Sequence, residues 1–530
     1  MRRRDQSTPG AIAYKRGKVK LCFRGCASSL TSPTKAATMP EPLGPWSNFR
    51  LETMGRMLAR VRAFAAFVTA LAALPALAQQ DILATLNQRP PYLDPANRVF
   101  VPPPEKSFSN YAIALGEAIG IDALIWGIDY ASGKPYAKIS GHSISQNFNK
   151  GWIVDTDDFW ANSLMHPLHG NLNYNAGRSQ GLNFYESFAT AFVGSLVWEQ
   201  FAEIQPPSLN DQVNTPFGGT MVGEMAFRLS RLILDSGGYA PGGWRQFFAF
   251  LVNPVGGVNR VAFGNKNHGA LLLPPSWLGE FRFGSVVAGS ERTQASGARD
   301  TTVGPWASFG AHIVYGIPGT PGLTLEKPFD HFEASGSVSL TSDITVQPTA
   351  TMLIRGLLVG DTLALGGEPG GLWGLFTSYD FIAPAVFRVQ GFGVGPGVAL
   401  VKRWGSFELH GTGVAEILPW SGGGSTVPLG VRDYHYGPGG DLVLELRGHF
   451  GDRVITRLEG RQYWISGAYA RGESENISHG KAEATVRISG IHGATASLIW
   501  SHRQASYPSE PDIWQRASVF SLYYTVLQGW

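Results

Sequence analysis

The sequence predicts an α+β protein, with an N-terminal helical module followed by a C-terminal antiparallel transmembrane β-barrel of about 10–12 strands. Three observations predict this fold class. Apolar residues recur at helical spacing in residues 106–255, whereas residues 256–530 alternate apolar and polar side chains with a period of two. Charged residues make up only 16% of the 530-residue chain, against about 25% in a typical soluble domain.

Residues 1–78 are interpreted as segments outside the folded protein. Residues 1–53 are basic and lack a sustained apolar period, so we predict a disordered extension of the gene model. In residues 54–78, three arginines precede an apolar run and small residues end at Ala78, which is typical of a secretory signal peptide. Residues 79–105 are rich in proline and predict a linker.

Removal of residues 1–78 changes the charge and the cysteine content. This leader carries 13 Lys and Arg and 3 acidic residues, so its loss turns the formal net charge from +3 to −7. Cys22 and Cys26 are lost too, which excludes disulfides, a thiol nucleophile and a Cys-type zinc site from the mature chain. A basic arm that binds nucleic acid is the alternative interpretation of residues 1–53, but it would have to coexist with an internal export signal. We therefore expect no nucleic-acid partner.

The helical module is predicted from short segments with helical spacing. Residues 108–129 contain three acidic residues, so we expect a pair of amphipathic helices there rather than a membrane-spanning helix. A later helix begins with a capping-box pattern at Ser208 and Asp211. Gly219 and Gly223 in that helix would allow close contact with another helix.

Polar residues cluster in this module, and eight of them are candidate catalytic residues. They are His166, His169, Arg178, Glu186, Glu199, Glu203, Asp211 and Glu224. A metal site could combine one of the two histidines with Glu199 and Glu203, which share a helix face, although His-x-x-His alone is a weak motif. A hydrolase or acyltransferase site could pair a serine with a histidine and a carboxylate. The serines considered are Ser179, Ser187 and Ser195.

A third interpretation of the same residues is a buried structural network. In such a network Arg178 neutralises carboxylates, while the asparagine and histidine side chains cap turns. A compact helical module with many short turns needs such partners, so we favour this interpretation. We expect no bound metal and no cofactor.

A string of motifs runs through the module. It consists of His166-Pro-x-His169-Gly170, Asn175-Ala-x-Arg178-Ser-x-Gly181, Glu186-Ser187, Gly194-Ser-x-x-Trp198-Glu199, Pro206-Pro-Ser208-x-Asn210-Asp211, Gly218-Gly, Gly223-Glu224, Asn253-Pro254 and Asn259-Arg260. This string resembles the DUF3943 family, a bacterial family of uncharacterised exported proteins, over about residues 95–265. The resemblance implies an envelope protein with a barrel-like C-terminal part, and it implies no reaction.

The alternating half of the chain fits either a membrane barrel or a soluble β-sandwich, because both alternate apolar and polar residues. Three features favour the membrane barrel. Eleven strand-like segments follow one another, often with short turns between them. Aromatic residues lie near the segment ends, as in an aromatic girdle, and the chain ends at Trp530 inside an alternating strand. A periplasmic β-sandwich fused to a helical domain is the alternative.

The favoured function is that of an outer-membrane β-barrel that acts as an envelope scaffold or narrow conduit. The helical module would face the periplasm or plug the lumen, since a barrel of this size has a narrow bore. The alternative is an outer-membrane lipid hydrolase or acyltransferase that uses the His, Glu and Asp candidates, so enzymatic activity stays open. Expected partners are the lipid bilayer and a lipid or small solute. The charges expected in the lumen are Arg447, Arg457, Glu459, Arg461, Glu483 and Arg487.

Overall fold

The computed structural model describes residues 105–529, apart from 156, 236–240, 265–275, 295–298, 304–305, 341–348, 426–433, 470–472 and 509–510. All the described residues belong to one compact unit, residues 67–530. The predicted gene-model extension, the signal peptide, nearly all of the Pro-rich linker and Trp530 lie outside the described residues. Those predictions therefore stay predictions.

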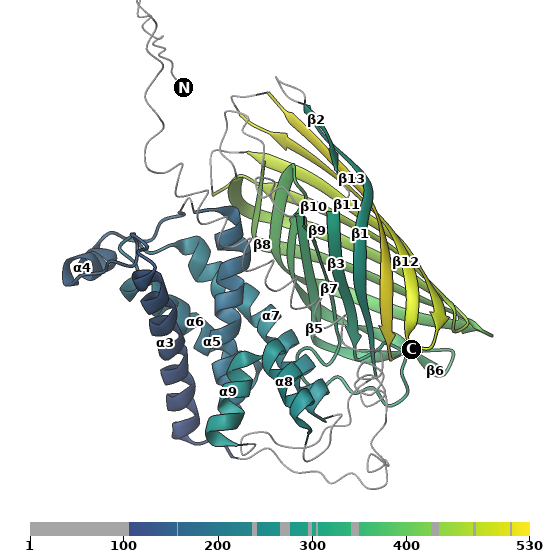
Figure 1. Cartoon of the computed structure of the whole chain (residues 1–530), viewed down its shortest axis with the longest axis horizontal. Coiled ribbons are helices and arrows are strands. Elements are labelled where there is room, and N and C mark those ends of the chain that lie inside the picture. The colour runs from purple at the N-terminus through teal and green to yellow at the C-terminus, as the bar shows by residue number, and fades with distance from the viewer. Residues whose placement is uncertain are drawn as a thin grey trace, which may run out of the picture. The chain divides into compact units, whose positions relative to one another are not determined.

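Seven α-helices precede the strands in the described part of the chain (Figure 1). They are α3 (Phe108–Ala131), α4 (Gly141–Asn149), α5 (His166–Ser179), α6 (Phe184–Phe201), α7 (Leu209–Asp235), α8 (Gly243–Val252) and α9 (Pro254–Phe263). A π-helical turn, η2 (Ala161–Met165), leads into α5. The cap expected before α7 is present, because the backbone N–H of Asp211 donates to the Ser208 hydroxyl at 3.2 Å.

The first of these helices is continuous, so the expected pair of helices in residues 108–129 is wrong. The acidic residue Asp122 does not break α3, because its carboxylate is buried and lies 2.7 Å from the His169 ring nitrogen Nε2. Within the described residues, α3 is the one helix that is long and apolar enough to cross a membrane. At about 1.5 Å per residue, its 24 residues span more than the roughly 30 Å of a bilayer core.

Helices α5 and α7 cross where glycine removes side chains from the contact. A Cβ atom added to Gly219 would lie 2.6 Å from the Cα atom of Gly170. A Cβ atom on Gly223 would lie 2.6 Å from Cδ1 of Tyr174. The close helix contact predicted from Gly219 and Gly223 is therefore confirmed.

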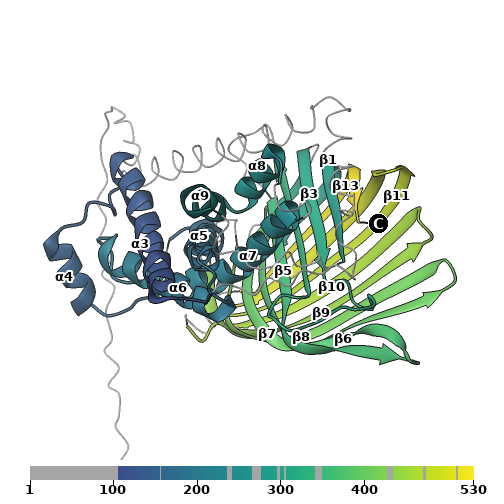
Figure 2. The same ribbon diagram turned by 90° about the horizontal axis from the view of Figure 1, so that it is seen from below.

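The strands form one antiparallel sheet that closes on itself by pairing β13 with β1 (Figures 1 and 2). The 13 described strands fill 12 positions, because β2 and β3 both pair with the same edge of β1. The predicted barrel of about 10–12 strands is therefore confirmed. The strands are β1 (Trp277–Gln294), β2 (Arg299–Val303), β3 (Trp306–Tyr315), β4 (Phe332–Leu340), β5 (Thr349–Leu365), β6 (Glu368–Ala383), β7 (Phe387–Trp404), β8 (Phe407–Ser425), β9 (Tyr434–Phe450), β10 (Val454–Ser466), β11 (Ser474–Ser489), β12 (His492–Ser506) and β13 (Ile513–Gln528).

The two ends of the barrel differ in their connections. At one end, here called the turn side, tight turns join β5 to β6, β7 to β8, β9 to β10 and β11 to β12. Gly405 and Gly451 in these turns have φ of 58° and 60°, a region that glycine adopts without strain. Strand β1 begins and β13 ends at the turn side, and the connection 316–331 between β3 and β4 lies there as well. The opposite end is called the loop side.

Alternate strand residues point into the lumen, where many are charged and buried. Arg457 on β10 reaches Glu333 on β4 at 3.0 Å and Glu445 on β9 at 2.9 Å. Arg461 pairs with Asp380 on β6 at 2.6 Å. Ion pairs between strands so far apart in the sheet cross the lumen, so the mixed-charge lumen expected from the alternation is present.

Apolar side chains fill further parts of the lumen. Phe376 and Val414 belong to one buried cluster, and Leu323 and Leu325 of the connection 316–331 pack against it. A second buried cluster lies nearer the loop side. Strand side chains and this connection therefore occupy much of the described lumen, and a small cavity lined by Arg282, Lys481 and Glu483 remains.

The helical module packs against the outer wall of the barrel. Because Asp380 points into the lumen, its neighbours Tyr379 and Phe381 point outward. The Tyr379 hydroxyl donates to the backbone carbonyl of Ser163 at 2.7 Å, and the ring of Phe381 lies 5.0 Å from that of Trp160. Among the described residues, the expectation that the module plugs the lumen is therefore wrong.

The contact between the module and the barrel runs along the wall from one side to the other. At the turn side, Arg228 of α7 pairs with Asp330 in the connection 316–331 at 3.0 Å. At the loop side, the amide of Asn162 donates to the hydroxyl of Tyr434, the first residue of β9, at 3.0 Å. Figures 1 and 2 show the helices beside the barrel wall in both views. The module lies alongside the barrel rather than beneath or inside it.

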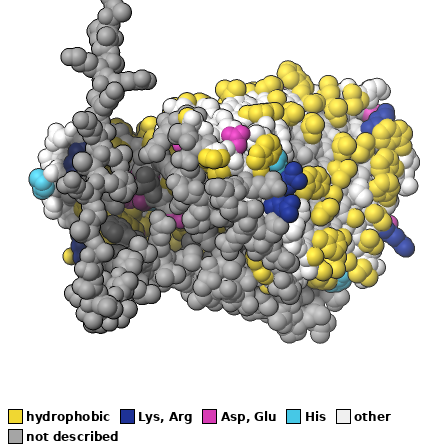
Figure 3. Space-filling model, turned by 90° about the horizontal axis from the view of Figure 1, so that it is seen from above, with side chains coloured by type: hydrophobic (Ala, Val, Ile, Leu, Met, Phe, Trp, Pro, Cys, Tyr) yellow, Lys and Arg dark blue, Asp and Glu magenta, His cyan; other side chains and the backbone are white. Residues whose placement is uncertain are grey.

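The barrel and the helical module share an apolar exterior over a polar interior. Figure 3 shows one face of the barrel, on which hydrophobic side chains predominate. In the module, the exposed fraction is 63% for Leu124 on α3 and 90% for Val261 on α9, whereas Glu224 and Asp211 are buried. Soluble proteins place large apolar side chains inside and charges outside. Further exposed apolar residues of the module are Leu115, Ile119, Ile128, Phe192, Leu196, Trp244, Phe247, Phe250, Val258 and Phe263, and those of the barrel include Leu444, Leu446, Leu458, Ile488, Leu498, Trp500 and Leu522.

Candidate functional site

The first polar group of the module lies where α6 ends and α7 begins. We call it the acidic group, and it consists of Asp155, Glu199, Glu203 and Asp211. His166 joins it, with its Nε2 atom 3.5 Å from Asp211 Oδ2. The other ring nitrogen of His166 lies 3.2 Å from the hydroxyl of Thr215. The structure thus brings four of the predicted site residues to one end of the module: His166, Glu199, Glu203 and Asp211.

Glu199 and Glu203 are held by different partners at this end of the module. Glu199 accepts a hydrogen bond from the backbone N–H of Ser208 at 2.7 Å, and Glu203 accepts one from the indole N–H of Trp198 at 2.5 Å. Burial, with a further contribution from the charge of Asp157, raises the pKa of Glu203 to about 7. Glu203 therefore keeps its proton to a higher pH than a free glutamate does.

His169 belongs to a separate pair. Its Nε2 atom lies 2.7 Å from Asp122 Oδ1, which also accepts a hydrogen bond from the Asn173 amide at 3.0 Å. The His169 ring stands edge-on to Trp198, with 5.0 Å between the ring centres. The two histidines therefore have different carboxylate partners, Asp211 for His166 and Asp122 for His169.

Arg178 and Glu224 form a second buried group near the turn side. Glu224 lies 2.9 Å from Arg178, 2.8 Å from Arg228 and 2.7 Å from the Tyr174 hydroxyl. Glu186 lies away from both groups, in the capping box of α6, where it pairs with Lys106 at 2.6 Å. The eight predicted site residues are therefore distributed over four places in the module.

Two of the three serines of the hydrolase hypothesis have backbone partners, whereas the hydroxyl of Ser179 is buried and has no hydrogen-bond partner among the described residues. The hydroxyl of Ser187 donates to the carbonyl of Leu182 at 3.5 Å, and that of Ser195 donates to the carbonyl of Asp211 at 3.4 Å. These are bonds that stabilise helix ends and helix contacts. A catalytic role for any of the eight candidates stays a prediction.

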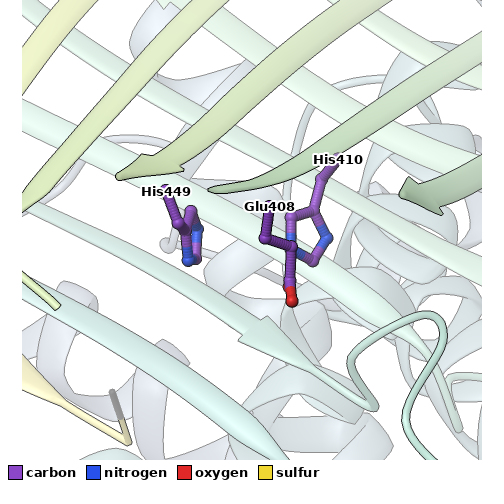
Figure 4. Close-up of side chains that lie close together, drawn as sticks. All are labelled: Glu408, His410 and His449. Carbon is purple, nitrogen blue, oxygen red and sulfur yellow. The ribbon is translucent and has the colours of Figure 1, made fainter. Parts of the chain in front are cut away.

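Two groups of His and Glu in the barrel were missed by the sequence analysis. His312, Glu333 and Glu445 lie close together, but Glu333 and Glu445 are already paired with Arg457. The other group is Glu408, His410 and His449, shown in Figure 4. Its sequence signal was a Glu-x-His at the start of one strand and a histidine at the end of the next, which antiparallel pairing brings together.

Part of the helical module matches a known protein family. Residues 151–255 match the DUF3943 family. The family is described as a domain of unknown function, so the match to DUF3943 assigns no reaction. The resemblance proposed from the sequence is confirmed over these residues, which is a shorter range than 95–265. All eight predicted site residues lie within the part that matches DUF3943.

Comparison with solved structures gives matches of low sequence identity, three of which follow. A loop-deletion mutant of OmpT, an outer membrane protein of Vibrio cholerae, is 9% identical, with 48% of this chain and 99% of that chain covered and a TM-score of 0.19. The COG4313 outer membrane channel from Pseudomonas putida F1 is 10% identical, with 48% and 96% covered and a TM-score of 0.23. The Pseudomonas putida toluene transporter TodX is 7% identical, with 48% and 90% covered and a TM-score of 0.21. At these scores the likeness carries no argument about function. No curated protein matches the sequence.

Proposed function

We propose that this chain is an outer-membrane scaffold, in which a closed barrel anchors the DUF3943-like helical module within the bilayer. The observation that carries the proposal is the contact of the module with outward-facing barrel residues such as Tyr379 and Phe381. In a membrane barrel the outward face meets lipid. A body that covers this face lies at the level of the bilayer, where its exterior must be apolar.

The exposed side chains of the module support this placement. Leu115, Ile119, Leu124 and Ile128 of α3 are exposed, and α8 and α9 add further apolar side chains. Several charged residues of the module, among them Arg228 and Glu224, are directed inward and paired, as are ionisable residues within membranes. The short turns of the barrel would face the periplasm, as they do in bacterial outer-membrane barrels.

The occupation of much of the lumen by side chains favours a scaffold over a conduit. Charged side chains such as Arg457 and Glu333 meet across the lumen, and the connection 316–331 packs Leu323 and Leu325 into its turn-side part. Side chains fill the interior of narrow barrels, whereas open aqueous channels belong to barrels of 16–18 strands. We therefore expect no steady ion current through the barrel.

Planar-bilayer recording of the refolded full chain tests this function. Heat-modifiable migration on a gel first establishes that the barrel has folded. The proposal predicts inserted protein without stepwise conductance. Regular conductance steps from heat-modifiable protein would overturn the scaffold and support a conduit.

An enzyme that acts on lipid is the second candidate function, because His166 and Asp211 form a buried pair in a module that meets the bilayer. An ionisable pair within a membrane is a functional-site hypothesis by default. If the pair is catalytic, His166→Ala and Asp211→Asn will each abolish phospholipid turnover and leave heat-modifiability intact. Turnover equal to that of the unchanged protein in both variants would exclude this candidate.

A further inference from the structure

Three potential metal ligands meet at the turn-side mouth of the lumen. Glu408 and His410 are the second and fourth residues of β8, and His449 is the last but one of β9. Glu408 and His449 are paired partners in the register of the two strands. The three residues point to the same side of the sheet (Figure 4), which is the lumen side, since Val414 shares the register of Glu408 and His410.

The ligand atoms of these three residues are close enough for one ion. One donor atom from each of Glu408, His410 and His449 lies within 4.8 Å of the other two. A tetrahedral Zn²⁺ with bonds of about 2.0–2.2 Å would hold its ligands roughly 3.5 Å apart. Side-chain rotations that move each donor atom by about 1 Å are therefore enough to bring the three ligands to the spacing that a bound ion requires.

The surroundings of the three residues point to a ligand as well. His410 is buried, and its Nδ1 atom has no hydrogen-bond partner among the described residues. A buried ring nitrogen without a partner is costly unless a ligand satisfies it. Glu408 is held by Arg403 at 2.5 Å and by His410 at 2.5 Å, so its carboxylate is already oriented.

Two positive charges, those of Arg403 and Arg447, oppose a cation at this place. Arg447 pairs with His410 in the strand register, and its Nε and Nη1 atoms are buried without a hydrogen-bond partner among the described residues. Its positive charge repels a metal ion but would attract an anion. Two imidazoles and one carboxylate are a common set of zinc ligands. A small ion bound between them needs no larger cavity in the lumen.

We propose that Glu408, His410 and His449 form a binding site for a divalent transition metal of the zinc type at the turn-side mouth of the barrel. Glu408 and His449 are partly exposed, so the ion enters from the turn-side compartment. Nitrogen ligands select Zn²⁺ over Mg²⁺, which prefers oxygen donors. This inference does not depend on the scaffold proposal, because a conduit or an enzyme could carry the same site.

The test uses the full chain refolded in detergent with Cys22→Ser and Cys26→Ser, which removes the cysteine ligands outside the barrel. Calorimetry should show one Zn²⁺ per chain and no Mg²⁺ binding, and Co²⁺ should give the absorption of a tetrahedral site. His449→Ala and Glu408→Gln should each weaken Zn²⁺ binding more than about 100-fold. His479→Gln, a lumen histidine bonded to Ser501 at 2.9 Å, is the matched control and should bind as tightly as the parent.

Arg447→Met separates the metal from an anion. The proposal predicts tighter Zn²⁺ binding in this variant, because a like charge has been removed. Stoichiometric binding of inorganic phosphate that depends on Arg447, together with no specific Zn²⁺ binding, would overturn the metal site. Zn²⁺ binding that survives both His449→Ala and Glu408→Gln in heat-modifiable protein would overturn it too.

Discussion

Glu224 is the residue on which the buried charge balance of the helical module depends. It is paired with both Arg178 and Arg228, and Tyr174 donates to it as well. Arg228 in turn reaches Asp330 of the barrel connection. Loss of Glu224 would leave two buried guanidinium groups with too little compensating charge.

Replacing Glu224 with alanine should therefore destabilise the protein by about 3–5 kcal/mol, the usual cost of breaking a buried ion pair from one side. Urea unfolding of the refolded chain in lipid vesicles measures the change. Lys106→Ala, which removes the more exposed partner of Glu186, is the control and should cost less than about 1 kcal/mol. Equal effects of the two substitutions would contradict the buried network.

Glu203 makes the stability of the module depend on pH. Its folded pKa is raised to about 7 by burial, above the value of about 4.3 for a free glutamate. The folded state therefore holds the proton more tightly than the unfolded state between these values. Its contribution to stability is fully present below about pH 4.3 and is lost as the pH rises through about 7.

We predict that the protein is harder to unfold at pH 5 than at pH 8, and that Glu203→Gln reduces this difference. Unfolding midpoints in urea at the two pH values measure it. The amide keeps an acceptor for the indole N–H of Trp198, so the hydrogen bond can persist in the variant. An unchanged pH dependence in Glu203→Gln would show that other groups cause it.

At the scale of the elements, the crossing of α5 and α7 depends on Gly219. Gly219 lies so close to the backbone of Gly170 that no side chain fits between the two helices. Gly219→Leu should therefore destabilise the protein by about 1–3 kcal/mol or more through overpacking. Gly116→Leu on α3 is the matched control, because a Cβ atom there meets nothing within 4 Å. Urea unfolding that cannot distinguish the two variants would argue against the close crossing.

The sequence predicted elements better than it predicted their arrangement. Period-two alternation around Arg457 and Arg461 identified the barrel and its charged lumen, and Gly219 identified a helix contact. The acidic residues of α3 suggested a break, because the sequence does not show that Asp122 is covered by His169. The metal ligands Glu408 and His449 escaped notice because they are 41 positions apart and meet only through strand register.

At the scale of the whole molecule, the position of the helical module could not be predicted from the sequence. The sequence pattern of an apolar strand face is the same whether lipid or a helix covers that face. Tyr379 and Phe381 alternate with lumen residues as a lipid-facing pair would, yet they contact Ser163 and Trp160. The module was expected inside or beneath the barrel. Its contact along the outer wall explains why its polar residues face inward and its apolar residues face outward.

The barrel and the module belong to one compact unit with a shared apolar surface. Removing the module therefore uncovers barrel residues that it now protects, among them Tyr379, Phe381 and Tyr434. On the proposed placement, the outer face of α3, where Leu124 is exposed, contacts lipid rather than water. The position of Leu124 relative to the bilayer is thus the central claim.

Lipid quenching of a fluorophore at Leu124 tests this claim most directly. Single cysteines are placed at Leu124 on α3, at Leu444 on the outer face of β9 and at Ser145 on α4, in the Cys22→Ser and Cys26→Ser background. Each is labelled with bimane in vesicles of brominated lipid. We predict strong quenching at Leu124, comparable with Leu444, and little quenching at Ser145. Quenching at Leu124 as weak as at Ser145, with Leu444 strongly quenched, would place the module in water and contradict the account.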